Sequence, residues 1–323
     1  MAKKKPETVE TLFQAIQYFA DENEAVEYVA SFRWPSGEQE CPHCGSVAMH
    51  YFLKPRRAWK CRDCRKVFSV KVGTIFEDSP VKLGKWLPAM WLLANCKNGI
   101  SSYELARDLG VTQKTAWFML HRIRLAMQAG SFEKKMRGKV EADETYIGGK
   151  AKNMHLAKRK RVIRGTGGMD KIAVMGLLER PRGAEHSLVR TTVLDKVTKR
   201  RIQAEIDKHI APGATVMTDK FLSYSGVKVN HVHEVIDHAV AYVRGSVHTN
   251  GLENFWSLVK RTLHGTYVSI EPFHVFRYLD EQAFRFNNRK ANDGQRFIRL
   301  VREIVGKRLT YDQLTGADRR QPA

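Results

Sequence analysis

The sequence predicts a multidomain chain of mixed α+β and α/β class, in which a small cysteine-bearing ribbon and a helical region precede a larger domain built on a mixed sheet. Three observations support this prediction. Four cysteines stand in two matched pairs near the N-terminus. Apolar residues then recur at helical spacing, and beyond Lys139 short β-rich runs alternate with amphipathic stretches. The length of 323 residues agrees with about two domains.

The charge balance favours a polyanionic partner. Fifty-five lysines and arginines face 34 acidic residues, which gives a net charge of +21, and basic side chains gain affinity for phosphates by releasing counterions. The hydrophobic content of 43% excludes a wholly disordered chain. The longest apolar run, Trp86 to Ala94, is far shorter than the roughly 18 residues of a membrane span. No secretory signal follows the charged N-terminus, so we expect a cytoplasmic protein without membrane contact.

The N-terminal segment, 1–37, is expected to be helical, and the ribbon follows at 38–78. Its cysteines form two C-x2-C pairs with 16 residues between them: Cys41, Cys44, Cys61 and Cys64. Two residues between thiolates let one tight turn present both sulfurs to one ion, and two such turns close a tetrahedron around Zn2+. Because all four ligands are thiolates, the zinc should be structural; unpaired thiols or a redox pair are the alternatives. We expect His43 to be exposed and not a ligand, and Cys96 to be core.

A helix-turn-helix is predicted within 79–132. Ser101 and Glu104 have the spacing of a capping box, Gly110 is placed to end that helix, and Thr112 to cap the next one. On this interpretation, the side chains that face the DNA major groove are Gln113, Lys114, Trp117 and His121. An ordinary helical hairpin is the alternative, but the neighbouring ribbon and the basic charge favour DNA binding.

The mixed-sheet domain is expected at 138–308, with the order strand, strand, strand, helix, strand, strand, helix, helix. The strands are predicted at 140–147, 171–178, 186–194, 215–218 and 234–236, and the helices at 198–210, 248–263 and 272–288. A polar tail, expected to fray, closes the chain at 309–323.

A basic stretch without acids runs from Lys150 to Gly168, between the first two predicted strands. Its densest part is Lys158, Arg159, Lys160 and Arg161. A solvated loop and a segment that positions a phosphate backbone are compatible interpretations.

Three acidic residues of the mixed-sheet domain stand where its topology can bring them together. Asp143 lies within the first strand, Asp219 at the end of a later strand, and Glu253 on a helix. Sites in open sheets lie outside the carboxyl ends of the strands, which suits Asp219. On the helix, Leu252, Phe255, Trp256 and Val259 form an apolar stripe that leaves Glu253 and Lys260 on a polar face. Taken singly, each acid could be an ordinary surface charge. Converging carboxylates would repel one another unless hard cations lay between them, and Mg2+ prefers such oxygen ligands.

These blocks resemble the DDE-type transposases of bacterial insertion sequences, and most of all the ISXO-type branch that carries a zinc ribbon. The resemblance covers nearly the whole chain and rests on the ribbon and on EADETYIGGK, TDKFLSY and HTNGLENFWSLVKR. It implies a ribonuclease-H-like catalytic domain in which Asp143, Asp219 and Glu253 are the metal-binding catalytic triad, assisted by Lys260.

The resemblance also implies a two-step reaction on double-stranded DNA, supported by two Mg2+ or Mn2+ ions. Activated water cuts the strand at the element's end, and the freed 3′-hydroxyl then attacks a target phosphodiester. The ribbon and the helix-turn-helix would bind the terminal inverted repeats. Because two ends must be held together, we expect a homodimer or higher oligomer on DNA and association with the nucleoid.

Two other functions remain open on the sequence. A DNA-binding regulator would use the ribbon and the helix-turn-helix, but it has no need of three acids directed at one point. A related metal-dependent nuclease would cut DNA without joining it.

Overall fold

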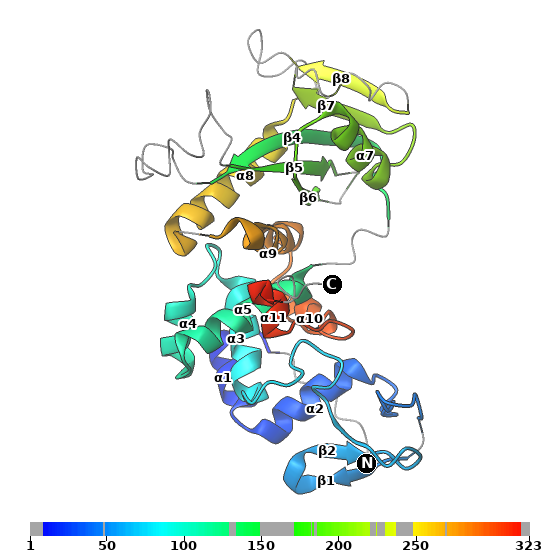
Figure 1. The fold of residues 1–323 in the computed structure, drawn as a ribbon, viewed down its shortest axis with the longest axis vertical. Helices are drawn as coiled ribbons and strands as arrows, with labels where there is room; N and C mark the ends of the chain where they lie inside the picture. The colour runs from blue at the N-terminus through cyan, green and yellow to red at the C-terminus, as the bar shows by residue number, and fades with distance from the viewer. Residues whose placement is uncertain are drawn as a thin grey trace. The chain divides into compact units, whose positions relative to one another are not determined.

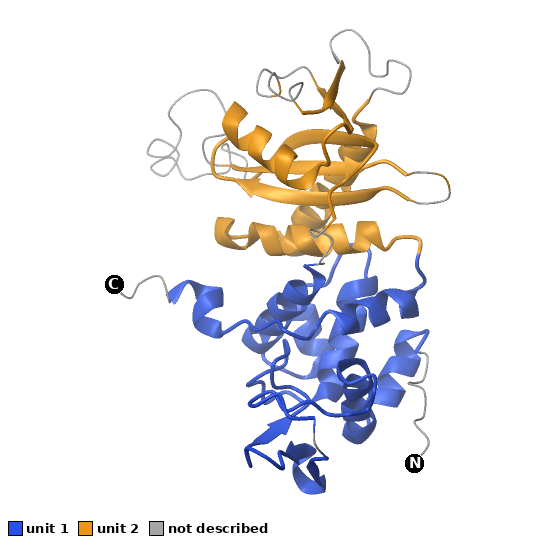
Figure 2. Ribbon diagram, turned by 90° about the vertical axis from the view of Figure 1, so that its right-hand side faces the viewer, with its two compact units in different colours: residues 1–128, 291–323 blue, residues 129–290 orange. Residues whose placement is uncertain are grey.

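The computed structural model describes residues 9–47, 49–128, 134–148, 171–181, 183, 186–219, 224, 230–236, 248–268 and 270–317. The chain divides into two compact units, shown in Figure 2. Unit 1 comprises residues 1–128 and 291–323, and unit 2 comprises residues 129–290. The basic stretch from Lys150 to Gly168, with Lys158, Arg159, Lys160 and Arg161, lies outside the described residues.

Unit 1 contains a small antiparallel sheet and a set of helices (Figure 1). Its sheet has the order β1-β2-β3, with β1 (Tyr51–Leu53), β2 (Ala58–Lys60) and β3 (Val67–Ser69). A 3-10 turn, η1 (Lys54–Arg56), joins the first two strands. The helices are α1 (Leu12–Phe19), α2 (Glu22–Arg33), α3 (Leu83–Asn95), α4 (Ser102–Leu109), α5 (Gln113–Met127), α10 (Asp293–Arg302) and α11 (Tyr311–Thr315).

Side-chain caps set the starts of several of these helices, as the sequence predicts. The Ser101 hydroxyl accepts the Glu104 amide at the start of α4, and the Thr112 hydroxyl accepts the Thr115 amide at the start of α5. Gly110 ends α4 in the left-handed conformation, with a φ of 59°. The predicted N-terminal helical segment is two helices, because Asp21 caps α2 directly after α1 ends.

The predicted boundary at residue 308 differs from the structure, in which unit 2 ends at Lys290 and α10 folds into unit 1. Phe297 of α10 is fully buried, and its ring centroid lies 5.3 Å from that of Trp91 and 5.9 Å from that of Phe19. Apolar spacing alone does not reveal which core a helix joins, and here the aromatic residues of α1 and α3 provide the partners.

The C-terminal segment up to residue 317 is also more ordered than the predicted fraying tail. The Arg122 guanidinium donates to the Leu309 carbonyl oxygen at 3.0 Å, and Thr310 caps α11 with a capping box. Leu314 is buried, so the segment contributes to the core of unit 1.

Unit 2 is a mixed α/β domain with the predicted order of elements. Its described strands form a five-stranded sheet with the order β6-β5-β4-β7-β8. Strand β4 pairs antiparallel with β5 and parallel with β7, which in turn pairs parallel with β8. The strands are β4 (Lys139–Ile147), β5 (Ile172–Glu179), β6 (Leu188–Leu194), β7 (Thr215–Asp219) and β8 (Val232–Ile236).

Helices cover both faces of this sheet (Figure 1). Helix α7 (Lys199–His209) packs Ile202 and Ile206 on one face, against Val140 and Ala142 of β4. The other face is covered by α8 (Asn250–Thr262) and α9 (Val275–Asn287), which are joined through the π-helical turn η6 (Leu263–Tyr267) and the 3-10 turn η7 (Pro272–His274). Because strand side chains alternate, even-numbered residues of β4 face α7 and odd-numbered residues face α8.

Within the described residues, no helix is long and apolar enough to cross a membrane.

Replacement of Phe297 by Ala should destabilise unit 1 by about 3–5 kcal/mol, because it leaves a cavity among the aromatic rings that this side chain joins. Denaturant unfolding, followed by tryptophan fluorescence, measures the change. Phe13→Ala is the matched control: this side chain is 69% exposed, so we expect a change within about 0.5 kcal/mol. Equal effects of the two substitutions would contradict the placement of α10 in the core.

Candidate functional site

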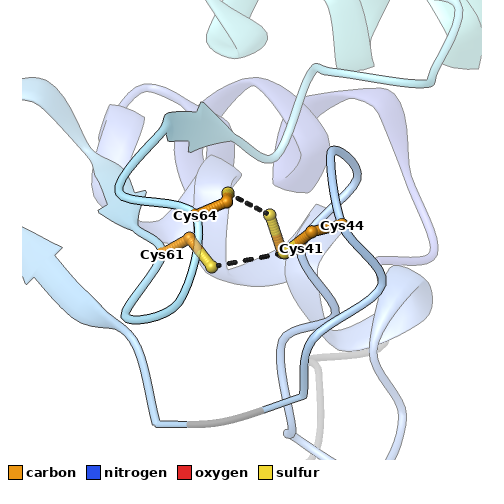
Figure 3. A group of neighbouring side chains, drawn as sticks. All are labelled: Cys41, Cys44, Cys61 and Cys64. Atoms are coloured by element: carbon orange, nitrogen blue, oxygen red, sulfur yellow. Dashed lines mark hydrogen bonds between the residues drawn. The ribbon is translucent and has the colours of Figure 1, made fainter.

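Four cysteine side chains converge in the ribbon of unit 1 (Figure 3). The Sγ atoms of Cys41 and Cys64 lie 3.7 Å apart, those of Cys44 and Cys61 lie 3.6 Å apart, and all four lie within 4.8 Å of one another. Four sulfurs placed about 2.3 Å from a central Zn2+ in a tetrahedron stand about 3.8 Å apart. The cysteines therefore have the identity and the spacing of a structural zinc site.

Two similar turns hold these cysteines. Gly45, directly after the first pair, has a φ of 71°, and Arg65, directly after the second pair, has a φ of 61°. The Cys41 amide donates to the Ser46 carbonyl, and the Cys61 amide donates to the Lys66 carbonyl. Glycine adopts a positive φ readily, which suits Gly45, whereas Arg65 adopts the same conformation without the freedom of glycine. His43 is exposed and outside the cluster, and Cys96, expected in the core, is only half-buried at the end of α3.

The predicted groove-facing residues of α5 do not form one exposed surface. Lys114 is exposed, with its ammonium 4.7 Å from the centre of the Tyr311 ring. Gln113 is half-buried and donates to the Ser102 hydroxyl. The prediction for His121 is wrong, because its side chain is fully buried against Trp117 and does not reach the surface. Helical spacing alone places His121 near the exposed face of α5, but most side chains in the C-terminal half of this helix are buried.

In unit 2, the strand register places Asp143 and Asp219 side by side. Strands β4 and β7 are parallel, with Ala142 opposite Thr218, and each acid is the next residue of its strand. Neighbouring side chains of paired strands point to the same face of a sheet. Asp143 points to the face that α8 covers, because the Trp256 indole N–H donates to its Oδ2 at 3.0 Å.

Helix α8 has the two faces that the sequence predicts. Leu252, Phe255, Trp256 and Val259 are buried against the sheet. Glu253 and Lys260 are exposed and seven residues apart, which puts them on one side of the helix, two turns from each other. The Thr249 hydroxyl donates to Glu253 Oε1 at 3.3 Å.

A glycine lets α8 lie close to Asp143. Gly176 of β5 is directly opposite Asp143 in the antiparallel register. A Cβ atom at Gly176 would stand 2.5 Å from the Trp256 ring, so any other residue would push the indole away from the sheet. Neither Gly176 nor the polar role of Trp256 could be predicted from the sequence. Tryptophan in an apolar stripe usually indicates only core packing.

The environment of Asp143 disfavours its charge. Burial raises the pKa of Asp143 to about 6 from its ordinary value of 3.8, and the negative charges of Glu253 and Asp219 act in the same direction. Hydrogen bonds from the Glu144 backbone and the Trp256 indole partly offset this. On the opposite face of β4, burial also raises the pKa of Glu144 to about 7, and Tyr224 donates to its carboxylate at 2.5 Å.

The acidic residues fit hard divalent cations by donor chemistry and charge. Carboxylate oxygens are the ligands that Mg2+ and Mn2+ prefer, and a cation would relieve the repulsion that Asp143 experiences from Asp219 and Glu253. Among the described residues, however, the four cysteines are the group whose ligand atoms lie close enough to share one ion. The carboxylates of Asp143, Asp219 and Glu253 lie farther from one another than the four thiols do.

Fold and sites together define a two-unit protein with a four-cysteine ribbon in one unit and, in the other, a mixed sheet that carries Asp143 and Asp219 on its interior strands β4 and β7. Comparison with known proteins gives the family. A family model described as "ISXO2-like transposase domain" matches residues 135–287, and one described as "Transposase zinc-ribbon domain" matches residues 20–67. The chain is 30% identical to an uncharacterized protein in transposable element ISH50 of Halobacterium salinarum, over 77% of this chain and 85% of the relative. The chain therefore belongs to the ISXO2-like transposase family.

Cys64→Ser should abolish zinc binding and unfold the ribbon, because removal of one thiolate opens the tetrahedron and metal binding is coupled to folding in such sites. Metal analysis of the purified protein measures the zinc content, which we expect to be about one ion per wild-type chain. Cys96→Ser, outside the cluster, is the control and should retain its zinc. A wild-type zinc content near zero would contradict the assignment.

Asp143→Asn should stabilise the metal-free protein at neutral pH. Because the pKa of Asp143 is higher in the folded chain than in the unfolded one, its ionised carboxylate costs stability above about pH 6, by at most about 3 kcal/mol. That cost should disappear as the pH falls below about 4, where the carboxyl is protonated in both states. Thermal unfolding in magnesium-free buffer at pH 7.5 and pH 4 measures the difference. A gain of equal size at both pH values would show that the charge is not its cause.

Proposed function

We propose that this protein is the transposase of an insertion sequence, and that Asp143, Asp219 and Glu253 hold the two divalent metal ions at which DNA strands are cut and joined. One observation carries the proposal: Asp143 and Asp219 directly follow the paired residues Ala142 and Thr218 of two parallel strands, and the helix that bears Glu253 is bonded to Asp143 through Trp256. The raised pKa of Asp143 supports it: burial is the main cause, and the negative charges of Glu253 and Asp219 act in the same direction.

The net charge strengthens this interpretation. In a chain of net charge +21, a buried carboxylate such as Asp143, whose pKa is raised by burial and further by Glu253 and Asp219, does not contribute to general attraction to DNA. When bound between such carboxylates, two metal ions activate the attacking oxygen and stabilise the leaving oxygen of an in-line phosphoryl displacement. The protein contributes rigid placement of the carboxylates, and Lys260 offers a positive charge to a DNA phosphate two turns along α8 from Glu253.

The proposed fold of unit 2 is ribonuclease-H-like. A five-stranded mixed sheet with α7 on one face and α8 and α9 on the other supports this. In unit 1, the ribbon and the pair α4 and α5 would bind the terminal inverted repeats, with Gln113, Lys114 and Trp117 as candidate contacts. The short turn between these helices, closed by Gly110 and Thr112, supports a helix-turn-helix.

Transposition requires two element ends in one complex, so we propose a homodimer or higher oligomer on DNA. The relative from Halobacterium salinarum is a protein of a transposable element, which agrees with an element-borne role here. A regulator that only binds DNA is the less favoured alternative, because it does not account for the acidic arrangement around Asp143. A nuclease that cuts without joining would use the same site, and only the products distinguish it.

Asp143→Asn, Asp219→Asn and Glu253→Gln should each reduce Mg2+-dependent cleavage by at least about 100-fold while DNA-end binding is retained, because each removes one charged ligand. The substrate is labelled DNA that carries the ends of the element, taken from the sequence that flanks the gene. Denaturing gels resolve nicked and joined products. Asp195→Asn is the control, since this exposed side chain of unit 2 forms an ion pair with Arg201, at 3.8 Å.

Joined products that depend on metal and on Asp219 would establish a transposase. Nicking without joining would identify a nuclease, and tight binding without nicking would identify a DNA-binding protein. Wild-type cleavage by any one of the three acid variants would exclude that residue from the site.

A further inference from the structure

Helix α8 lacks a cap from its own N-terminal residues. Thr249, the N-cap residue, makes no side-chain capping bond, and its hydroxyl donates instead to Glu253. The first amides of a helix have no partner within the helix and normally receive one from a neighbouring side chain. Here the acceptor comes from the sheet: Oε2 of Glu141, on β4, accepts the Leu252 amide at 3.0 Å.

The carboxylate of Glu141 is almost completely buried and is paired in charge. Its side chain is 2% exposed, and Oε1 accepts the Arg180 Nε at 2.7 Å. Arg180 also donates to the His248 carbonyl at 2.8 Å, so the guanidinium fastens the segment that leads into α8. A carboxylate at this position also faces the positive end of the helix dipole.

The sequence at the start of α8 is adapted to this contact. A Cβ atom at Gly251 would stand 2.8 Å from Glu141 Oε2, closer than real Cβ atoms approach such a group. Any larger residue at position 251 would require the Glu141 carboxylate to shift away from its present position at the helix end. This is a constraint on Gly251 that turn formation does not require, since its φ is not in the left-handed region.

Strand β4 and helix α8 are thus joined at two points whose spacings agree. Glu141 bonds to the Leu252 amide, and Asp143 bonds to the Trp256 indole. Two residues of a strand span about 6.8 Å, and four residues of a helix span about 6 Å. Two matched attachments fix both the height and the rotation of α8 on the sheet, and Glu253 lies between them.

We propose that Glu141 is a positioning residue, which caps α8 from β4 and thereby sets where Glu253 stands relative to Asp143. This proposal rests on the proposed function of the three acids. Buried ion pairs add little to stability compared with apolar packing, so orientation accounts better for the burial of Glu141 and Arg180. Residues that orient metal ligands typically change metal affinity by about 10–100-fold when they are replaced.

The first experiment tests the cap without reference to catalysis. Hydrogen exchange of the full-length protein, followed at the Leu252 amide, should accelerate at least about tenfold in Glu141→Ala, which removes the acceptor. Glu141→Gln keeps an acceptor and serves if the alanine variant fails to fold, with a smaller acceleration expected. Unchanged exchange in both variants would overturn the proposal.

The second experiment tests the consequence for the acids. Calorimetric titration with Mn2+ should show about 10-fold weaker binding in Glu141→Gln, with zinc content and thermal stability close to those of the wild type. Gly251→Ala should weaken Mn2+ binding similarly, and Gly251→Ala combined with Glu141→Ala should be no worse than Glu141→Ala alone, because the clash is then absent.

The matched control is Glu179→Gln, which removes a carboxylate at the end of β5 that accepts the Arg137 amide at 2.9 Å. Lower stability with unchanged Mn2+ affinity in Glu141→Gln would assign Glu141 a purely structural role and overturn the proposal. If Asp219→Asn leaves Mn2+ binding intact while Glu141→Ala still accelerates Leu252 exchange, the proposed function fails and the cap remains.

Discussion

The arrangement of unit 2 depends on the placement of negative charge under a helix. Strand β4 directs Glu141 and Asp143 to the same face, where α8 covers them. A carboxylate in such a place is costly unless it is paired or hydrogen-bonded. Glu141 meets this requirement through Arg180 and the end of α8, whereas Asp143 meets it only in part, through the Glu144 backbone and the Trp256 indole. The deficit that remains at Asp143 appears as its raised pKa.

Glu141 and Asp143 therefore differ in how well the protein itself balances their negative charge. The charge of Glu141 is balanced within the protein, so its carboxylate can fasten two elements permanently. Burial raises the pKa of Asp143, and the negative charges of Glu253 and Asp219 act in the same direction, so a cation bound there would lower it. Sites that act on a substrate are commonly less stable than the scaffold around them. Gly176 and Gly251 have no side chain that would separate α8 from the sheet, so the helix can pack closely there.

Unit 1 obtains its order from different sources. The ribbon has short strands, and its four thiolates are spaced to be held by one ion. The helices of unit 1 share an aromatic core. Phe297 belongs to this core, although it follows the whole of unit 2 in the sequence. Arg122 of α5 reinforces this core by donating to backbone carbonyls of Ile75, Glu77 and Leu309. Through these contacts, the C-terminal part of unit 1 packs against the N-terminal residues of the same unit.

Local patterns in the sequence determined the elements, the cysteine site and the two faces of α8, because periodicity, caps and ligand spacing act over a few residues. They also brought Asp143, Asp219 and Glu253 under consideration. Only the tertiary structure decided that α10 belongs to unit 1 and that His121 is buried. It also decided that Glu141, Gly176, Arg180 and Trp256 meet where α8 packs on the sheet. These features depend on which side chains meet after folding, and an apolar stripe or a strand carboxylate has the same local pattern whichever partner it finds.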